Sequence, residues 1–337
     1  MLNRELLIAS VLKPVNETRM YEKIGISLRD KGKWNLHVAG YEAQTENQEY
    51  TKFYTIFNKG RLHPARLFVS WKLFLLALKI KPAVLIVTTV ELLPISLWIK
   101  IFTGCKVVYD IQENYYLNLI HTKTFPPVIK HILAWWGRGL ELTSRIWVNQ
   151  YLLAEECYKW EMTFHRHNGT VVANKYKAPA HNYELATSKK DGEYRVIYTG
   201  TIGEHYGIFK ALERAEELHS KNHNVTFFIV GYCAQQSVLE ELKKQINGKN
   251  WITLIGGAQP VPHLKLLAEL RNADLGLMPY EISPATKNRI PTKLYEYKAA
   301  GLAYEITPNS AWVLDENESI YWESEEEKLL KIPALMI

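Results

Sequence analysis

The chain has 337 residues, of which 47% are hydrophobic and 23% charged, and it carries a formal net charge of +6. This length predicts two domains, because a domain typically spans about 100–200 residues. The composition is that of a globular protein and excludes disordered, collagen-like and coiled-coil chains. Three scattered cysteines are too few for a disulfide framework or a zinc site, and they indicate a reducing compartment.

The charge is unevenly distributed along the chain. Residues 1–187 hold 24 Lys and Arg against 15 Asp and Glu, whereas residues 188–337 hold 17 against 20. A basic half favours an anionic membrane or a nucleic acid as partner, although uneven solvation explains it as well. The first residues lack the apolar core and cleavage site of a signal peptide, so we expect a cytoplasmic protein.

Short apolar runs alternate with amphipathic stretches through the first half. Strands are predicted at Leu6–Leu12, Trp34–Ala39, Ala83–Thr88, Lys106–Asp110 and Arg145–Asn149. Helices are predicted at Met20–Lys31, Pro64–Lys79, Leu92–Phe102, Pro127–Leu142 and Leu152–Met162. Continuous apolar strands between helices are typical of a parallel sheet covered on both faces. The 20-residue run Ala83–Phe102 contains two charges and a proline, which favours a strand and a helix over a membrane span.

A second alternating series follows a polar, aperiodic stretch. This stretch, residues 178–192, is the predicted linker between an N-terminal domain of residues 1–177 and a C-terminal domain of residues 193–337. Strands are predicted at Tyr194–Tyr198, Val225–Val230, Ile252–Ile255 and Asp274–Met278. Helices are predicted at Ile208–Ser220, Ser237–Ile246, Val261–Arg271 and Pro291–Ala300. The fold class is therefore α/β, and a cleft between two such domains suits a small ligand.

The segment from Lys287 to Gly301, KNRIPTKLYEYKAAG, is the most informative part of the sequence. Pro291 suits the first turn of a helix, and Gly301 suits the left-handed turn that ends one. The free backbone N–H groups and positive dipole end of such a helix favour a phosphate. Three cations surround the helix start, Lys287, Arg289 and Lys293.

Lys293 and Glu296 lie three residues apart and therefore on the same side of the predicted helix. A carboxylate at Glu296 can accept hydrogen bonds from two adjacent sugar hydroxyls. The simpler interpretation is a capped helix on whose surface these two side chains form a pair. The spacing alone leaves both interpretations open.

Glycines follow the strands of the second half. Gly200, Gly203 and Gly207 lie between a strand and a helix, and Gly231 and Gly257 follow two later strands. Such turns bring backbone N–H groups close to a diphosphate. Because ligands of open α/β sheets bind outside the carboxyl ends of the strands, these turns predict one ligand crevice. Their spacing is not that of the dinucleotide fingerprint, and no Walker A lysine motif is present.

Polar residues also follow strands of the first half. Asp110, Gln112 and Glu113 come at the end of one strand, and Asn16 and Arg19 come after the first. These side chains can face the crevice from the other domain, although ordinary loop capping explains each of them. The sequence contains no Asp-x-Asp pair for a metal that bridges a diphosphate, and no Gly-x-Ser-x-Gly or His-Glu-x-x-His motif.

KNRIPTKLYEYKAAG resembles the segment Asn-x-x-Pro-x-Lys-x-x-Glu-(Tyr/Ala)-x-Ala-x-Gly of the family 4 nucleotide-sugar glycosyltransferases. Weaker similarity extends over most of the chain, with VIYTGTIGEHYGI resembling the phosphate-binding loop and KVVYDIQEN a first-domain segment. The resemblance implies the GT-B fold, in which two Rossmann-like parallel-sheet domains face a central cleft. It also implies a retaining, metal-independent glycosyltransferase without a cofactor. Its donor would be a nucleotide diphosphate-sugar, most simply a UDP-sugar, and its acceptor a glycan or lipid-linked molecule in cell-surface polysaccharide synthesis.

The resemblance also implies residue roles. Glu296 would hold the ribose hydroxyls, and Lys293 and the loop after Gly200 would contact the diphosphate. The implied catalytic residues are Asn288, Lys293 and Glu296. The implied donor-binding residues are Gly200, Thr201, Gly203, Gly231, Gly257, Thr292, Lys293, Leu294 and Glu296. The implied acceptor-side residues are Asn16, Arg19, Asp110, Gln112 and Glu113.

This resemblance gives the basic half a meaning, because many members act on lipid-linked acceptors at the inner face of a membrane. The stretch Lys130–Arg138 combines cations with Trp135 and Trp136, as interfacial helices do, although both tryptophans suit a core equally. We therefore expect peripheral contact with the inner membrane surface. Two alternatives are a GT-B sugar-nucleotide epimerase and a non-catalytic sugar-nucleotide-binding subunit that partners another transferase. Nucleic-acid binding is not expected, because no recognised module is present.

Overall fold

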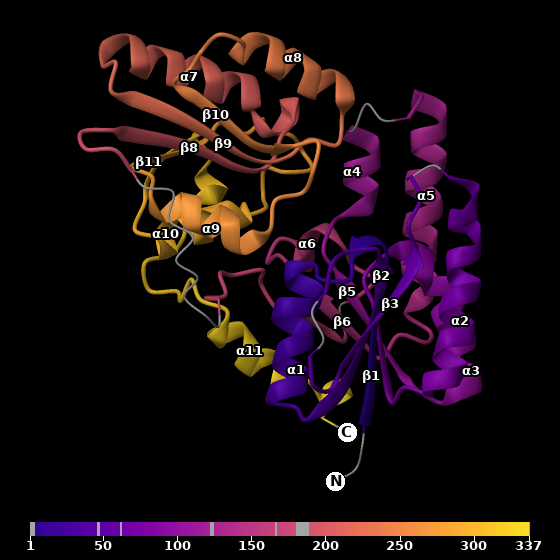
Figure 1. The fold of residues 1–337 in the computed structure, drawn as a ribbon. Coiled ribbons are helices and arrows are strands. Elements are labelled where there is room, and N and C mark those ends of the chain that lie inside the picture. The colour runs from indigo at the N-terminus through magenta and orange to yellow at the C-terminus, as the bar shows by residue number, and fades with distance from the viewer. Residues whose placement is uncertain are drawn as a thin grey trace. The chain divides into compact units, whose positions relative to one another are not determined.

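The computed structural model describes residues 4–45, 48–60, 63–121, 125–165, 167–179 and 189–336. The chain divides into two compact units, one of Met1–Asn174 with Trp322–Ile337 and the other of Lys175–Tyr321. Each is an α/β unit built on one parallel sheet, as predicted (Figure 1). Residues 180–188, which form most of the predicted linker, lie outside the described residues.

The first unit contains a seven-stranded sheet in the order β3-β2-β1-β4-β5-β6-β7, and its neighbouring strands pair in parallel. The strands are β1 (Arg4–Pro14), β2 (Trp34–Tyr41), β3 (Thr51–Phe57), β4 (Val84–Val87), β5 (Lys106–Ile111), β6 (Gln150–Leu153) and β7 (Gly169–Val171). All four residues of β4 are buried. A strand of this kind needs cover on both faces, which explains its unbroken apolar sequence.

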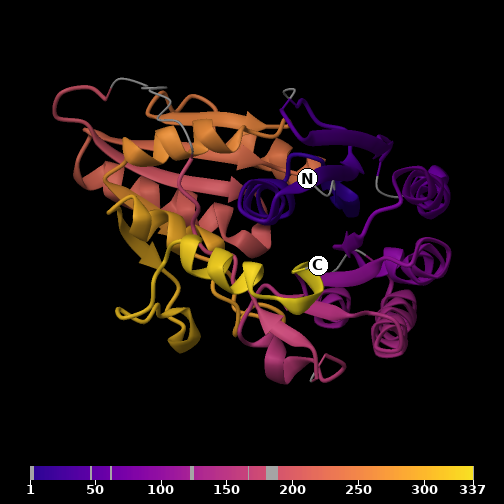
Figure 2. The same cartoon turned by 90° about the horizontal axis from the view of Figure 1, so that it is seen from below.

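Helices cover both faces of this first sheet (Figures 1 and 2). One face carries α2 (Val69–Ile80), α3 (Leu93–Thr103) and α5 (Pro127–Ser144), and Leu7 and Ala9 of β1 point into that core. The other face carries a π-helical segment, Thr18–Gly25, which continues into α1 (Ile26–Asp30), and also α11 (Glu323–Leu330). Two short helices, α4 (Tyr115–His121) and α6 (Tyr158–Glu161), follow β5 and β6. The alternation of side chains along β1 thus supplies two separate cores.

Two predictions near residue 150 are wrong. The strand predicted at Arg145–Asn149 is β6, which begins at Gln150, and the helix predicted at Leu152–Met162 is reduced to α6. The reason is that Asn149 acts as a connector, since its Oδ1 accepts hydrogen bonds from the Val107 backbone and the Lys100 ammonium. The strand β6 is therefore formed by the residues that follow, Gln150–Leu153. The edge strand β3, with its mixed polar and apolar sequence, was not predicted.

The assignment of residues 322–337 to the second domain is also wrong. Trp322 is 1% exposed and packs in the core of the first unit, where its Nε1 donates to the Ser27 hydroxyl at 3.0 Å. The Glu325 carboxylate accepts from the Ala173 backbone N–H at 2.9 Å. The apolar stripe that continues through Leu329 and Ile332 covers the sheet face beside α1, which explains why the segment returns.

The second unit contains a five-stranded sheet in the order β10-β9-β8-β11-β12. Its strands are β8 (Tyr194–Thr201), β9 (Val225–Tyr232), β10 (Ile252–Gly257), β11 (Leu275–Met278) and β12 (Ala303–Ile306). Its helices are α7 (Ile208–Lys221), α8 (Gln236–Ile246), α9 (His263–Arg271) and α10 (Thr292–Ala299). The four predicted strands and four predicted helices are confirmed to within three residues, and β12 was not predicted. Within the described part of the chain, no helix is long and apolar enough to cross a membrane.

Candidate functional site

The helix predicted after Pro291 is present as α10. Pro291 is the residue immediately before the helix and has an extended conformation, with a ψ of 128°. Gly301 lies just after the helix and has a left-handed conformation, with a φ of +65°. Both observations confirm the predicted start and stop of this helix. Thr292, Lys293 and Leu294 form its first turn, and Leu294 is only 1% exposed because it anchors the turn in the core.

Lys293 lies against Gly200, near the end of β8. A Cβ atom placed on Gly200 would lie 2.8 Å from the Lys293 Cε and 3.4 Å from its Nζ. Gly200 also has a φ of +83°, a conformation that other residues adopt at a cost. The backbone of this strand end and the first turn of α10 therefore meet around one ammonium group.

The Lys293 ammonium is buried and has no hydrogen-bond partner within the described residues. Its Nζ lies 4.4 Å from the ring centroid of Tyr198 and 5.0 Å from that of Tyr280. Burial lowers the pKa of Lys293 to about 7, while the negative charge of Glu296 opposes that shift. Two aromatic faces balance only part of a buried positive charge. The arrangement favours a bound anion at this position.

Glu296, one turn along α10, is paired with a different residue. Its Oε1 lies 3.3 Å from the Nε2 of His263 at the start of α9, and its side chain is 18% exposed. The alternative in which Lys293 and Glu296 pair on the helix surface is therefore wrong. Glu296 instead presents a partly exposed carboxylate that His263 orients.

The remaining predicted residues of the second unit have different surroundings. A Cβ on Gly231 would lie 1.7 Å from the Gly200 carbonyl oxygen, so this glycine is needed for strand packing behind Gly200. Gly257 is buried, with a φ of +72°, and Thr201 is exposed at the end of β8. Gly203 leads into the short turn before α7, and Asn288 lies half-buried in the turn before α10. The structure thus brings Gly200, Gly231 and Lys293 together.

In the first unit, two of the predicted residues form a buried ion pair. The Arg19 guanidinium donates to Asp110 at 2.7 Å and to the Val172 carbonyl at 2.8 Å, and both side chains are at most 1% exposed. Burial tends to lower the pKa of Arg19, but Asp110 outweighs this and holds it above its usual value. Both side chains lie in the interior, where the ion pair holds the strand ends together, and their predicted place on the acceptor side stays a prediction.

The other predicted residues of the first unit lie nearer the surface. Gln112 donates to Asp110 at 2.8 Å and accepts from Lys13. Glu113 accepts from the Asn118 amide at 2.8 Å, and Asn16 donates to the Gln44 carbonyl at 3.1 Å. Glu113 thus makes the kind of local contact that the capping alternative predicts, whereas Asn16 and Gln112 also contact residues distant in the sequence.

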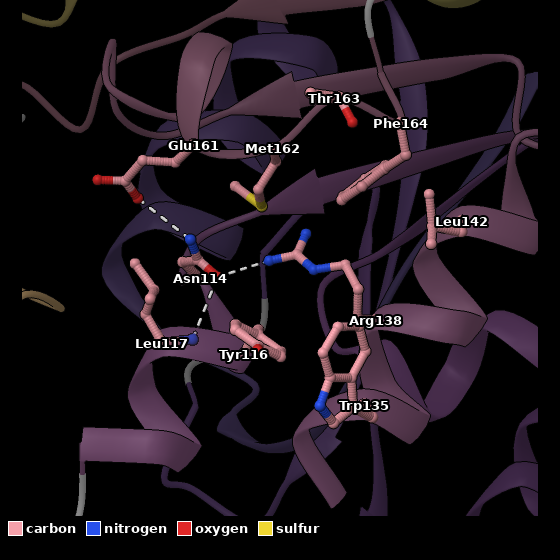
Figure 3. A pocket seen from close by; sticks show the side chains of 10 residues that line it. All are labelled: Asn114, Tyr116, Leu117, Trp135, Arg138, Leu142, Glu161, Met162, Thr163 and Phe164. Carbon is pink, nitrogen blue, oxygen red and sulfur yellow. Dashed lines mark hydrogen bonds between the residues drawn. The ribbon is translucent and has the colours of Figure 1, made fainter. Parts of the chain in front are cut away.

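The first unit also contains a cavity of about 370 Å³ that the sequence did not indicate (Figure 3). The Arg138 guanidinium points into it from α5, donates to the Asn114 Oδ1 at 2.8 Å and lies 5.5 Å from the rings of Tyr116 and Phe164. Burial raises the pKa of Glu141, which lies 3.0 Å from Arg138, to about 7. The remaining lining is mostly apolar, including Leu117, Trp135, Leu142 and Met162.

Residues 182–309 match the family described as Glycosyl transferases group 1. The chain carries a glycosyltransferase domain. This confirms the predicted enzyme class, and the matched region includes both Gly200 and Lys293. No curated protein matches the chain.

Solved structures with the same fold are distant in sequence. Sucrose-phosphate synthase from Thermosynechococcus elongatus is 11% identical, with a TM-score of 0.65 over 90% of this chain and 81% of that one. Anabaena HepE in complex with UDP and glucose is 11% identical, with a TM-score of 0.60 over 97% and 89%. An α,α-trehalose-phosphate synthase from Burkholderia vietnamiensis is 9% identical, with a TM-score of 0.59 over 99% and 93%. These similarities confirm the GT-B fold, with its two Rossmann-like domains.

Sequence reasoning missed three residues of this glycosyltransferase domain that surround the two key side chains. Tyr198 lies inside an apolar strand and Tyr280 follows another, so both read as ordinary core residues. His263 opens α9, which the sequence placed two residues earlier. Only the folded sheet brings these rings to Lys293 and Glu296.

Proposed function

We propose that this chain transfers a sugar from a nucleotide diphosphate-sugar, with UDP as the expected nucleotide, to a glycan or lipid-linked acceptor. The observation that carries the proposal is the buried, unpartnered ammonium of Lys293 at the start of α10. A diphosphate supplies the negative charge that this group lacks. The helix N-terminus adds free N–H groups and a favourable dipole.

In the proposed reaction, the bond between the sugar carbon and the diphosphate oxygen breaks, and the same carbon forms a bond to an acceptor hydroxyl oxygen. The hydroxyl proton passes to the departing diphosphate or to solvent, and negative charge develops on the departing oxygen. The Lys293 ammonium and the α10 N-terminus stabilise that charge, and the burial of Lys293 makes this electrostatic interaction stronger than it would be in water. Glu296, oriented by His263, accepts hydrogen bonds from the ribose hydroxyls. Asn288, in the turn before α10, is proposed to contact the donor sugar.

The finer features of the proposal rest on the resemblance in sequence. Transfer with retention at the sugar carbon belongs to family 4, and metal independence agrees with a sequence that lacks Asp-x-Asp. A role in cell-surface polysaccharide synthesis, in the cytoplasm at the inner membrane surface, is proposed on the same basis. The complexes of Anabaena HepE with UDP and with UDP-glucose support UDP as the first nucleotide to test.

The direct test is thermal unfolding of the purified chain with UDP, GDP, dTDP, CDP and ADP, each with and without magnesium. A ligand at about 100 times its Kd stabilises the native state by about 2.7 kcal/mol. We expect a magnesium-independent rise in Tm with UDP. No rise with any of these nucleotides contradicts the donor site.

Turnover distinguishes an enzyme from a non-catalytic binding subunit. We expect slow release of UDP from UDP-glucose in the absence of acceptor, and we expect Glu296→Ala to abolish it. Glu240→Ala, on an exposed position of α8, is the matched control and should keep the activity. Binding of UDP without any release by the wild-type chain, alone or with a cell-wall acceptor fraction, would favour the binding subunit.

A further inference from the structure

Large apolar side chains are exposed on the outer side of α2, α3 and α5 in the first unit. We call this surface the three-helix face and define it by Trp71, Trp98, Phe102, Val128, Ile132 and Trp135. Each of these side chains is more than half exposed, from 54% for Trp98 to 71% for Val128. Contiguous exposed apolar surfaces of this kind mark an interaction site.

The six residues lie on three helices that pack side by side. Helix α2 packs on α3, and α3 packs on α5, all on the same side of the sheet (Figures 1 and 2). The spacing of Val128, Ile132 and Trp135 places them on one side of α5, opposite the buried Gly137 and Glu141. Ring contacts between Trp71, Phe74 and Phe102, at 5.5 and 5.6 Å, join α2 to α3.

Tryptophan is concentrated on this face. Of the ten tryptophans in the chain, five are more than half exposed, and four of those five lie on α2, α3 and α5. Trp135 and Trp136 are 63% and 52% exposed, so the alternative that they are core residues is wrong. Tryptophan is the residue that membrane interfaces favour, because its ring is apolar and its N–H is polar.

The charges around the face select one kind of partner. Residues 51–150 hold thirteen Lys and Arg but only four Asp and Glu. The single acidic residue within α2, α3 and α5 is Glu141, which is buried, whereas Lys72, Lys79 and Arg145 are exposed. A second copy on the same face would bring like charges together, whereas an anionic surface would pair with them.

We infer that the three-helix face docks the first unit on an anionic lipid bilayer. The tryptophans and aliphatic side chains enter the interface, and the surrounding lysines and arginines pair with lipid phosphates. This deepens the proposed function, because it places the first unit where a lipid-linked acceptor would be found. The docking itself needs neither donor nor acceptor.

The test is sedimentation of the full chain with vesicles of phosphatidylcholine, with and without about one third phosphatidylglycerol. We expect the chain to sediment with the anionic vesicles. It should bind more weakly to vesicles of phosphatidylcholine alone, and more weakly at high salt. Val128→Glu is the key variant, because it lies in the first turn of α5, where an acidic residue also suits the helix dipole and folding is kept. Val313→Glu is its matched control, since Val313 is also 71% exposed but belongs to the second unit.

We expect Val128→Glu to weaken vesicle binding about tenfold, because an apolar contact is lost and a like charge is added. Val313→Glu should bind as the wild type does. Brominated lipid should quench the wild-type tryptophan fluorescence. Equal loss in both variants, or no binding to anionic vesicles, overturns the proposal. Analytical ultracentrifugation without lipid tests whether a second copy covers this face instead. Concentration-dependent dimers of the wild-type chain that Val128→Glu dissociates would overturn the proposal.

Failure of the docking and failure of the donor site are distinguishable. Lys293→Met removes the proposed diphosphate contact, and it should leave vesicle binding unchanged. Conversely, Val128→Glu should keep the rise in Tm that UDP produces. A joint loss of both properties in either variant would contradict the independence of the two sites.

Discussion

Each unit buries a cation near the carboxyl end of its central strands, and the two cations have opposite surroundings. In the first unit, Arg19 is held by both oxygens of Asp110 and by the Val172 carbonyl. In the second unit, Lys293 has two aromatic rings and no hydrogen bond within the described residues. A paired buried charge holds strands in place, whereas an unpaired one costs stability until a ligand arrives.

The largest expected effect comes from Asp110→Ala, which leaves Arg19 buried without its partner. Removing one member of a buried ion pair costs about 3–5 kcal/mol. Urea unfolding of the first unit, followed by circular dichroism, measures this loss. The double variant Arg19→Met with Asp110→Leu should be less destabilised than the single one. Equal stability of the two would show that Asp110 contributes through something other than this charge pair.

Lys293→Met should raise the free energy of unfolding, whereas Asp110→Ala should lower it. Replacing an uncompensated buried charge with an apolar side chain of similar length should stabilise the free protein by about 1–3 kcal/mol. The same change should weaken UDP binding at least about tenfold, because it removes a charged phosphate contact. Thermal unfolding and calorimetric titration give the two values. Lys298→Met, on the same helix, is the control that should change neither, and a less stable Lys293→Met would contradict the comparison.

The pH dependence sharpens the same contrast. The pKa of Lys293 in the folded chain is lowered to about 7, whereas a lysine in the unfolded chain has a pKa of about 10.4. As the pH rises, the folded chain therefore loses this proton first. The free energy of unfolding should therefore rise with pH between these two values. A bound diphosphate favours the charged form, so affinity for UDP-glucose should fall above pH 7, by up to about tenfold per pH unit. Titrations with Lys293→Met should lack this slope, and a slope that persists there would assign it to another group.

The smallest expected effect is that of Gly200→Ala. The added Cβ meets the Lys293 side chain, which must move, and UDP affinity should fall by about 1 kcal/mol, or roughly fivefold. Gly301→Ala has the same left-handed backbone but nothing within 4 Å of the added Cβ. Both variants should lose about 1–2 kcal/mol of stability, and only Gly200→Ala should lose affinity. Calorimetry on the pair separates the backbone effect from the contact.

The sequence predicted the second unit better than the first, for physical reasons. Local signals mark its strands and helices, such as Pro291 before α10 and the glycine after it. In the first unit, α11 was not predicted, and only the tertiary structure determines which sheet its apolar stripe covers. Likewise, the spacing placed Lys293 and Glu296 on one side of a helix, but it did not predict that one side chain is buried and the other bonds to His263.

The return of residues 322–337 to the first unit makes the second unit an insertion in the first. The two ends of the second unit are in contact, since the Tyr176 N–H donates to the Ile320 carbonyl at 3.0 Å and the rings of Tyr176 and Tyr321 are 6.0 Å apart. The two cut ends of the first unit are also close, since Lys23 contacts Asn174 and its Nζ lies 6.0 Å from the Trp322 ring. In each unit, the two chain ends that would be exposed by separating the units therefore already lie close together. We therefore expect that the first unit can be closed by linking Asn174 to Trp322, and that residues 175–321 can be expressed as a separate unit.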